Sequence, residues 1–393
     1  MMRTVIYLGL LLASAALLAW SAPALAFEFR GFGDVTYAYN TTNFPDAVLD
    51  HNNKTGRFAI GTLDLYLAEP IGDRMDVLAE IAIEPDQVFG QTGIDLERIQ
   101  VGYIFNDLLK IRAGRFHTFL GYWNVTYHHG TLMQTTIERP EFLNFEDHGG
   151  VFPVHAVGLW LSGRYKVPRL LIFNYDIMFT NGSRIVNAPV PQTVPPTAPI
   201  LPAGNLDMNL IGDDKPTKQL TIHLAWTPLV LRDLRIGVFG NKTRVNGYTG
   251  GQNDGLFMSV DQQIYGADVE YINQRIEFLS EYYYVLDKDL MGGTGWHNSD
   301  LYYVQLGVTL AERFIPYARY EQASLKDRSR SFADQDPYFA NQLMVGYKKG
   351  IVGMRYNLNS SSALKAEVQF VSPGAGDNYR SYTKYEASWA FAF

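Results

Sequence analysis

The charged side chains that could act as a group lie in two stretches of this chain. A basic set is formed by Arg98, Lys110, Arg112, Arg115 and Arg164. An acidic set is formed by Glu138, Glu141, Glu146 and Asp147. Opposed rows of charge in a narrow, partly desolvated opening create a transverse field, which orders polar solutes and disfavours apolar ones. The alternative is that these charges are solvated separately and share no constriction.

Other kinds of site chemistry find little support in the sequence. Histidines surround the acidic set, at His128, His129, His148 and His155, and imidazole is a common metal ligand. Their spacing matches no known site, so we expect packing and hydrogen bonding rather than a bound metal. No nucleophile motif, phosphate-binding loop or dinucleotide-binding glycine pattern is present. We therefore expect neither enzymatic activity nor a cofactor.

The start of the chain, residues 1–26, has the pattern of a secretory signal peptide. Arg3 supplies the positive charge, Val5 to Trp20 the apolar segment, and Ala24-Leu25-Ala26 the small-x-small cleavage site. The mature chain should then be residues 27–393, beginning at Phe27. A membrane-anchoring helix is the alternative, but the apolar segment is short and a cleavage site follows it at once.

The composition of residues 27–393 narrows the class of protein. Without Arg3 the chain holds 33 − 1 = 32 basic and 40 acidic side chains, a formal charge of 32 − 40 = −8, which argues against a nucleic-acid partner. There is no cysteine, which excludes disulfides, thiolate metal sites and a lipid-modified cysteine. No later apolar run is long enough for a membrane helix. The many Tyr (25) and Phe (23) residues of the full chain, all but Tyr7 within 27–393, are typical of the aromatic girdles of a membrane barrel.

The last residues of the chain show an alternation that repeats throughout it. From Tyr385 to Phe393, large residues occupy positions 385, 389, 391 and 393, with small or polar residues between them. This period of two indicates a strand with one apolar face. The same alternation is found at 63–67, 76–83, 98–103, 157–165, 171–179 and 364–370. A soluble sandwich would also alternate, but strands of about ten residues with charge on one face are what a lipid-facing barrel requires.

Sixteen such strands fit the sequence. We predict them near 28–39, 57–68, 75–84, 95–105, 109–117, 155–166, 169–180, 217–227, 233–242, 260–272, 275–286, 299–310, 314–324, 347–358, 363–371 and 382–393. Short connections alternate with long ones at 118–154, 181–216, 243–259 and 325–346. Short periplasmic turns and long outer loops are typical of outer-membrane barrels, whose even strand number places both termini in the periplasm. The expected fold is an all-β, transmembrane antiparallel barrel.

Closure of the barrel has a physical cause and a functional consequence. In a bilayer each backbone N–H and C=O needs a partner within the protein, so the strands must close on themselves. Sixteen strands enclose more volume than their inward side chains fill, and a water-filled channel is expected. On the predicted alternation Arg98, Lys110, Arg112 and Arg164 face this channel, whereas Arg115 breaks the pattern. Lumen-facing charges of the two signs are nearly balanced, which does not favour strong anion selectivity.

Three segments resemble known outer-membrane proteins. The C-terminal strand ending in Phe393 resembles the signal that such proteins present to the barrel assembly machinery. The segment 118–154 is the third outer loop, and it resembles the loop that folds into the pore of sixteen-stranded trimeric porins. The stretch from Gly114-Arg115-Phe116 to His155-Ala156-Val157-Gly158 is similar to segments of the porin superfamily that holds the phosphate-selective porins. These resemblances imply an outer-membrane homotrimer in which 118–154 is the constriction loop.

The resemblance does not identify the solute. The stretch Glu146-Asp147-His148-Gly149-Gly150 departs from the Pro-Glu-Phe-Gly-Gly signature of general diffusion porins, and no dense set of lysines for phosphate is present. The proline-rich stretch Pro189 to Pro202 favours extended polyproline conformations within the outer loop 181–216. We expect it to be a surface loop without a partner.

The segment 118–154 carries the sharpest prediction. Lying outside the barrel it would expose an apolar patch to water, formed by Phe119, Tyr122, Trp123, Phe142 and Phe145. We therefore predict that it folds inward and faces a basic wall that includes Arg98 and Arg112. The expected function is a porin, surrounded by outer-membrane lipid, through which small polar or charged solutes diffuse. The alternatives are a barrel that sheathes or anchors a partner such as an electron carrier, and an adhesin or receptor.

Overall fold

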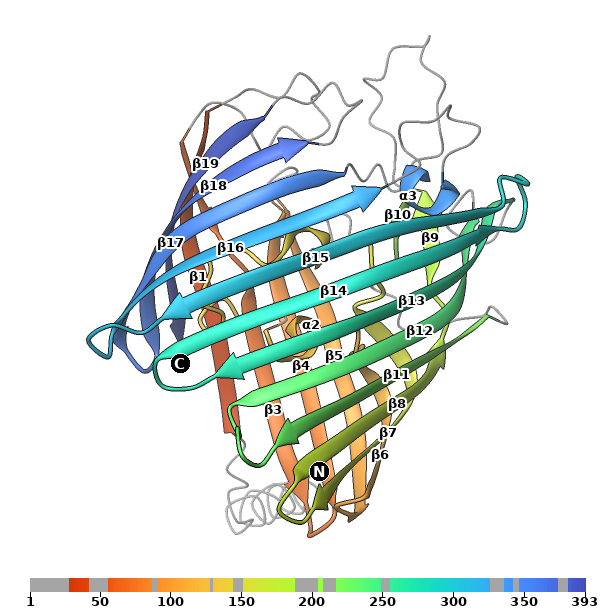
Figure 1. The fold of residues 1–393 in the computed structure, drawn as a ribbon, viewed down its shortest axis with the longest axis horizontal. Coiled ribbons are helices and arrows are strands. Elements are labelled where there is room, and N and C mark those ends of the chain that lie inside the picture. Colours follow the sequence, from red (N-terminus) through yellow and green to blue (C-terminus); the bar gives the residue numbers. More distant parts are fainter. Residues whose placement is uncertain are drawn as a thin grey trace, which may run out of the picture.

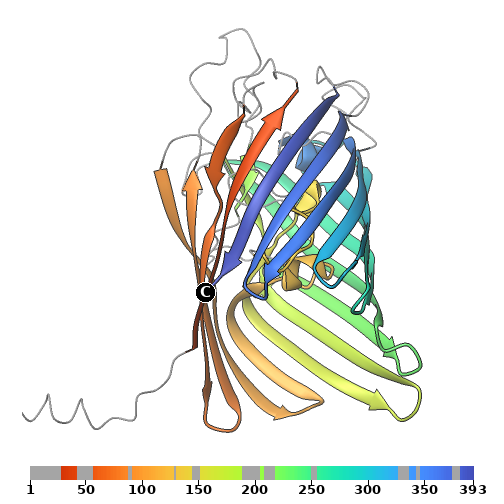
Figure 2. The ribbon, with the colours of Figure 1, turned by 90° about the vertical axis from the view of Figure 1, so that its left-hand side faces the viewer.

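Sixteen antiparallel strands close into a barrel in the computed structural model of the chain (Figures 1 and 2). The structure describes residues 28–41, 56–86, 91–127, 130–143, 151–187, 204–207, 217–248, 255–325, 336–341, 346–373 and 381–393. The wall strands are β1 (Glu28–Asn40), β2 (Arg57–Ile60) with β3 (Leu63–Ile71) as one strand in two parts, β4 (Met75–Asp86), β5 (Gln91–Asn106), β6 (Leu109–His117), β7 (His155–Val167), β8 (Leu171–Asn181), β11 (Lys218–Pro228), β12 (Leu234–Tyr248), β13 (Leu256–Ile272), β14 (Ile276–Asp289), β15 (Trp296–Val308), β16 (Phe314–Leu325), β17 (Tyr347–Asn359), β18 (Ser362–Pro373) and β19 (Tyr382–Ala392). The predicted all-β barrel is confirmed.

The two ends of the described chain close the barrel. Strands β1 and β19 pair antiparallel, with Phe32 opposite Ala392 and Asn40 opposite Lys384. Beyond this register, Gly31 and Phe393 exchange two backbone hydrogen bonds of 3.0 Å. A β-carbon on Gly31 would lie 2.4 Å from the Phe393 ring, so only glycine fits under that ring. The aromatic C-terminal residue therefore packs directly against the first strand.

Side-chain exposure along the strands confirms the predicted alternation. Ile99 is 50% exposed and Phe370 is 55% exposed on the outer face, whereas the neighbouring Gln100 and Gln369 are buried. The same contrast separates Leu364, which is exposed, from its buried neighbours Ala363 and Lys365. Apolar side chains on the outside and polar ones within are the arrangement that a barrel in lipid requires.

Several strand limits differ from those predicted. Strands β12 and β13 continue pairing beyond the predicted loop limits, from Lys242 opposite Gln263 to Tyr248 opposite Leu256, so the connection 243–259 is shorter than expected. The predicted strand 57–68 is interrupted at Gly61, where a β-carbon would lie 2.1 Å from a carboxylate oxygen of Asp34. The alternation in the sequence indicated neither the greater length of β12 and β13 nor the break at Gly61.

Two short strands and three short helical segments lie apart from the wall. Strands β9 (Arg184–Asn187) and β10 (Gly204–Leu206) pair with each other within the predicted loop 181–216, and β9 also runs parallel to β12. The helical segments are α2 (Trp123–Thr126), η2 (Glu141–Leu143) and α3 (Pro337–Asn341). Within the described ranges no helix is long and apolar enough to cross a membrane.

Some predicted features lie outside the described residues. These are the signal peptide 1–26, Phe27, His128, His129, the stretch 144–150 with Phe145, Glu146, Asp147 and His148, and the proline-rich stretch 189–202.

Candidate functional site

The described parts of the segment between β6 and β7 (118–127, 130–143 and 151–154) lie within the outline of the barrel in two perpendicular views (Figures 1 and 2). The two ends of this segment, at Thr118 after β6 and at Val154 before β7, lie side by side, and we call this place the neck. The backbone N–H of Thr118 donates to the carbonyl of Val154 at 2.9 Å. The amide of Asn124 donates to the carbonyls of both residues, at 2.9 and 3.0 Å. One buried side chain thus holds the two ends of the segment together.

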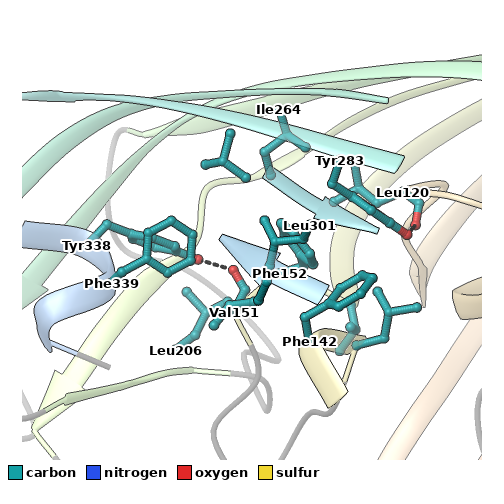
Figure 3. Packing of buried hydrophobic residues seen from close by; sticks show 14 of the residues in the cluster. Leu120, Phe142, Val151, Phe152, Leu206, Ile264, Tyr283, Leu301, Tyr338 and Phe339 are labelled. Carbon is teal, nitrogen blue, oxygen red and sulfur yellow. Dashed lines mark hydrogen bonds between the residues drawn. The ribbon is translucent and has the colours of Figure 1, made fainter. Parts of the chain in front are cut away.

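An apolar cluster packs this segment against the inner wall of β12–β17 (Figure 3). The segment contributes Leu120, Trp123, Tyr127, Phe142, Leu143, Val151, Phe152 and Val154, and the wall contributes Phe239, Ile264, Tyr283, Leu301 and Tyr303 among others. The rings of Phe152 and Tyr283 are stacked at 4.7 Å. Of the aromatic residues predicted to form an exposed patch on an outward segment, Trp123 and Phe142 are buried and Phe119 and Tyr122 are partly buried, because they pack inside the barrel.

Carboxylates of the wall satisfy backbone N–H groups of the segment. Glu281 on β14 accepts from the N–H of Tyr122 at 2.8 Å and from that of Trp123 at 2.6 Å, at the start of α2. The hydroxyl of Tyr283 donates to the carbonyl of Leu120 at 2.9 Å. A buried helix start needs such acceptors, since its first N–H groups have no partner within the helix.

Cations of the wall satisfy backbone carbonyls of the same segment. The ammonium of Lys365 on β18 donates to the carbonyls of Thr131, Gln134 (2.7 Å) and Thr136 (2.9 Å). Arg355 on β17 donates to the Gln134 carbonyl at 2.8 Å. These charged groups of the lumen are therefore used to hold a stretch of the segment that has no regular secondary structure.

A further pair of wall residues holds the next stretch. Arg319 on β16 donates to the carbonyls of Glu138 at 2.8 Å and Arg139 at 3.0 Å. Two positions further along the same strand face, Glu321 accepts from the backbone N–H of Glu141 at 2.6 Å. Charge-assisted bonds of this kind are about twice as strong as neutral ones.

The carboxylate of Glu138 is the charged contact between the segment and the last strands. It accepts from Lys349 on β17 at 2.9 Å and pairs with Lys384 on β19, while Lys349 also reaches Glu141 at 3.1 Å. Although burial acts in the opposite direction, the two ammonium groups hold the pKa of Glu138 well below its usual range. Glu138 and Glu141 therefore lie against β17 and β19, which corrects the prediction that they oppose Arg98 and Arg112.

A cavity of about 320 Å³ lies on the other side of the segment, against the wall formed by β1 and β3–β6. The wall contributes Arg30, Phe32, Tyr66, Ala68, Leu78, Arg98 and His117, and the segment contributes Val125, Thr126 and Met133. The segment thus has two different faces. One is packed on β12–β19, and the other borders a space lined by arginine, histidine and aromatic side chains.

The arginines of this wall are paired with carboxylates of β4. Arg98 bonds to Glu80, whose side chain is fully buried, whereas that of Arg98 is 18% exposed. Arg112 contacts Asp76 at 3.2 Å, and its guanidinium lies 4.6 Å from the centre of the Trp160 ring. Of these two arginines only Arg98 lines the cavity, and there the cation is more exposed than the carboxylate to which it is bonded.

The remaining members of the predicted basic set lie elsewhere. Lys110 is near the short-turn end of β6, six residues before Phe116, hence about 20 Å from the level of Arg98. Arg164 is exposed near the turn after β7. Arg115 is buried beyond Gly114, whose φ of +137° interrupts the regular strand. Of the predicted basic set only Arg98 lines the cavity, and Arg112 remains a predicted member of the wall; Lys110 and Arg164 lie toward the short-turn end.

Sequence reasoning missed several residues that shape the site. Arg30, Tyr66 and His117 line the cavity, and Lys349 and Lys384 hold Glu138. All lie on strands that were predicted correctly. Alternation assigns residues to a face of the strand, but it does not say which lumen-facing charges will meet an inward segment.

No protein-family model matches the chain, and no characterised protein matches it in sequence. Its three-dimensional arrangement does match solved structures. An anion-selective porin from Comamonas acidovorans aligns at a TM-score of 0.57, with 13% identity over 94% of this chain and 99% of that one. The outer membrane channel DcaP of Acinetobacter baumannii aligns at 0.53, with 11% identity over 93% and 97%. The trimer form of OmpT of Vibrio cholerae aligns at 0.54, with 10% identity over 94% and 99%.

The fold is that of a sixteen-stranded outer-membrane barrel. The alignments span nearly the full length of both chains, so the likeness covers the whole wall rather than one group of strands. At such low identity the shared property is the fold, and the solute and the assembly state must be argued from this chain's own residues.

Proposed function

We propose that this protein is an outer-membrane porin through which small polar or charged solutes diffuse passively. The observation that carries the proposal is the division of the lumen by the segment 118–154. On one side the segment is packed on β12–β19, and on the other a cavity lined by Arg30, Arg98 and His117 borders it. A closed barrel of sixteen strands has room for such a passage.

The wall of the passage favours anions weakly. Arg98 covers the carboxylate of Glu80, so the positive partner is the one nearer to the solute. At Arg112 the carboxylate of Asp76 is the more exposed partner, which reduces the preference at that level. Pairs of opposite sign side by side suit polar solutes because they offer both donors and acceptors.

Assembly as a homotrimer belongs to the same proposal. A similar solved structure is described as a trimer form, and exposed apolar side chains cover the outer face of the barrel on all sides. Surrounding outer-membrane lipid would cover those that a neighbouring copy does not. Folding is proposed to depend on the barrel assembly machinery, which would read the aromatic strand ending in Phe393.

The proposal is tested by reconstituting the folded barrel in a planar lipid bilayer. A porin should give discrete current steps, and in a salt gradient the reversal potential should show a small anion preference. A barrel that sheathes or anchors a partner protein should instead remain closed alone and co-purify with that partner. Absence of current steps from folded barrel inserted in the bilayer would contradict the proposed function.

A further inference from the structure

Two histidines and one glutamate converge at the neck of the inward segment. His117 is the last residue of β6, His155 is the first residue of β7, and Glu97 lies on β5 beside them. One ligand atom from each residue lies within 4.8 Å of the other two. The Nε2 atom of His155 is 2.5 Å from Oε2 of Glu97, and all three side chains are buried.

The backbone places these three groups together. His117 and His155 are opposite each other in the β6–β7 register, with ring centres 5.3 Å apart. Glu97 lies at an irregularity of β5, because Arg98 pairs with Glu80 while the next pair is Leu96 with Ile81. Bulges of this kind change the direction of a side chain and are frequent near functional sites.

We propose that Glu97, His117 and His155 form a binding site for a divalent transition-metal ion of the zinc type. Imidazole nitrogen and carboxylate oxygen are ligands that zinc accepts at about 2.0–2.2 Å, which places tetrahedral ligand atoms about 3.4 Å apart. The 2.5 Å separation between His155 and Glu97 is shorter than that value and the other separations are within 4.8 Å, so side-chain rotations would bring the three atoms around one ion. Three protein ligands leave the fourth position for water.

Neighbouring charges tune the site. Oε2 of Glu80 is 3.8 Å from Nε2 of His117, beyond hydrogen-bonding distance, and adds a second negative charge beside the site. Arg98 is bonded to Glu80, and the buried Arg115 adds a positive charge two residues before His117. Glu97 is thus the carboxylate that offsets the charge of the ion.

The other convergent acidic group of the described residues is a different case. Glu138, Glu367 and Glu386 also lie within reach of one another, but Lys349 and Lys384 already neutralise this group. No histidine belongs to it. The ammonium groups of the lysines take the place that a metal ion would need.

A metal ion at the first site would join three strands at the neck. It would link the start of the inward segment, its end and the bulged position of β5, in addition to the backbone bond between Thr118 and Val154. His117 lines the cavity, so the ion would lie beside the passage. Binding itself does not depend on conductance, and the two proposals can fail separately.

Titration of the folded, chelator-treated barrel with Co²⁺ tests the site. We expect the visible absorption of four-coordinate Co²⁺, and Zn²⁺ should abolish it by displacement. His155→Asn and Glu97→Gln should weaken Co²⁺ binding more than about tenfold, since losing even an outer-shell partner costs about 10–100-fold. His297→Asn removes a histidine from β15, away from the site, and should bind like the wild type.

A second measurement needs no variant and so does not depend on the variants folding. X-ray absorption at the zinc edge of the wild-type barrel loaded with one equivalent of Zn²⁺ should show two imidazoles and a carboxylate. A zinc environment without imidazole would overturn the proposal. Equal Co²⁺ affinity in folded His155→Asn and wild-type barrels would overturn it as well.

Discussion

The guanidinium of Arg98 covers the buried carboxylate of Glu80, so that a cation and not an anion borders the cavity. The two residues lie opposite each other on β5 and β4. Glu80 has no exposed surface of its own, and it would meet the cavity only if Arg98 moved or were replaced. The positive charge at this level of the passage therefore depends on Arg98 together with Arg30, which lines the same cavity.

Replacing Arg98 should lower the positive charge at this level of the passage. In Arg98→Met the side-chain length is kept but Glu80 is no longer covered, and we expect the reversal potential to move toward cation preference. The shift should shrink at high salt, because the screening length falls from about 10 Å at 0.1 M to about 3 Å at 1 M. Arg164→Met, near the turn after β7, is the control and should shift the potential less. An unchanged reversal potential in Arg98→Met at low salt would remove Arg98 from the passage.

Neighbouring lysines on β17 offer a matched pair of variants. Lys349 is buried and bonded to Glu138 and Glu141, whereas Lys348 points outward and is exposed. Lys349→Met should loosen the segment, because a hydrogen bond to a charged group contributes roughly 1.5–3 kcal/mol. We expect frequent fluctuations of the open-channel current in Lys349→Met and a quiet current in Lys348→Met. Equal noise in the two variants would contradict the proposed anchoring.

The same anchor should depend on pH in a defined direction. The pKa of Glu138 is lowered, so its ion pairs contribute fully above the ordinary glutamate pKa of about 4.3 and are lost only as the pH falls through the lower pKa of the folded state. Wild-type current should therefore remain quiet through the ordinary glutamate range and fluctuate only well below about pH 4.3. Glu138→Gln should fluctuate at neutral pH already and change little on acidification. An acid-induced transition of the same size in Glu138→Gln would assign the transition to another group.

The wall of the barrel could be predicted from the sequence because each strand is marked by the alternation of its own neighbouring residues. Alternation between apolar and polar positions follows from the strand geometry itself, and it placed Ile99, Phe370 and Gln100 on the correct faces without knowledge of the rest of the chain. A break such as that at Gly61 depends on a contact with Asp34 of another strand, and no local pattern records it.

The site could be predicted only in part because it depends on long-range pairing. Glu138 was expected to oppose the arginines of β5 and β6, but it meets Lys349 and Lys384, more than two hundred residues later in the chain. Likewise His155 was considered with nearby histidines in sequence, whereas its partners are Glu97 and His117 on adjacent strands. The spacing of residues along the chain does not show which residues of distant strands will meet.

Two neighbouring residues of β7 test the assignment of its faces. Leu161→Arg would place a charge on the outer face near the middle of the strand, at an expected cost of roughly 2–4 kcal/mol if this is the bilayer midplane. Ser162→Arg would direct the same side chain toward the lumen, and its cost should be much smaller. Unfolding of the barrel by urea in lipid vesicles measures both. The reverse order of stability would mean that the assigned faces are exchanged.

The central claim is that solutes pass between the inward segment and the wall of β1 and β3–β6. Met133 borders that cavity, and since the chain has no cysteine, Met133→Cys provides a unique reactive site. Single-channel current should be recorded before and after modification with a negatively charged methanethiosulfonate reagent, with labelling verified by mass. Leu159→Cys, on the outer face, is the control. The account predicts a stepwise fall in the Met133→Cys current and none in the control, whereas an unchanged current through fully labelled Met133→Cys would contradict it.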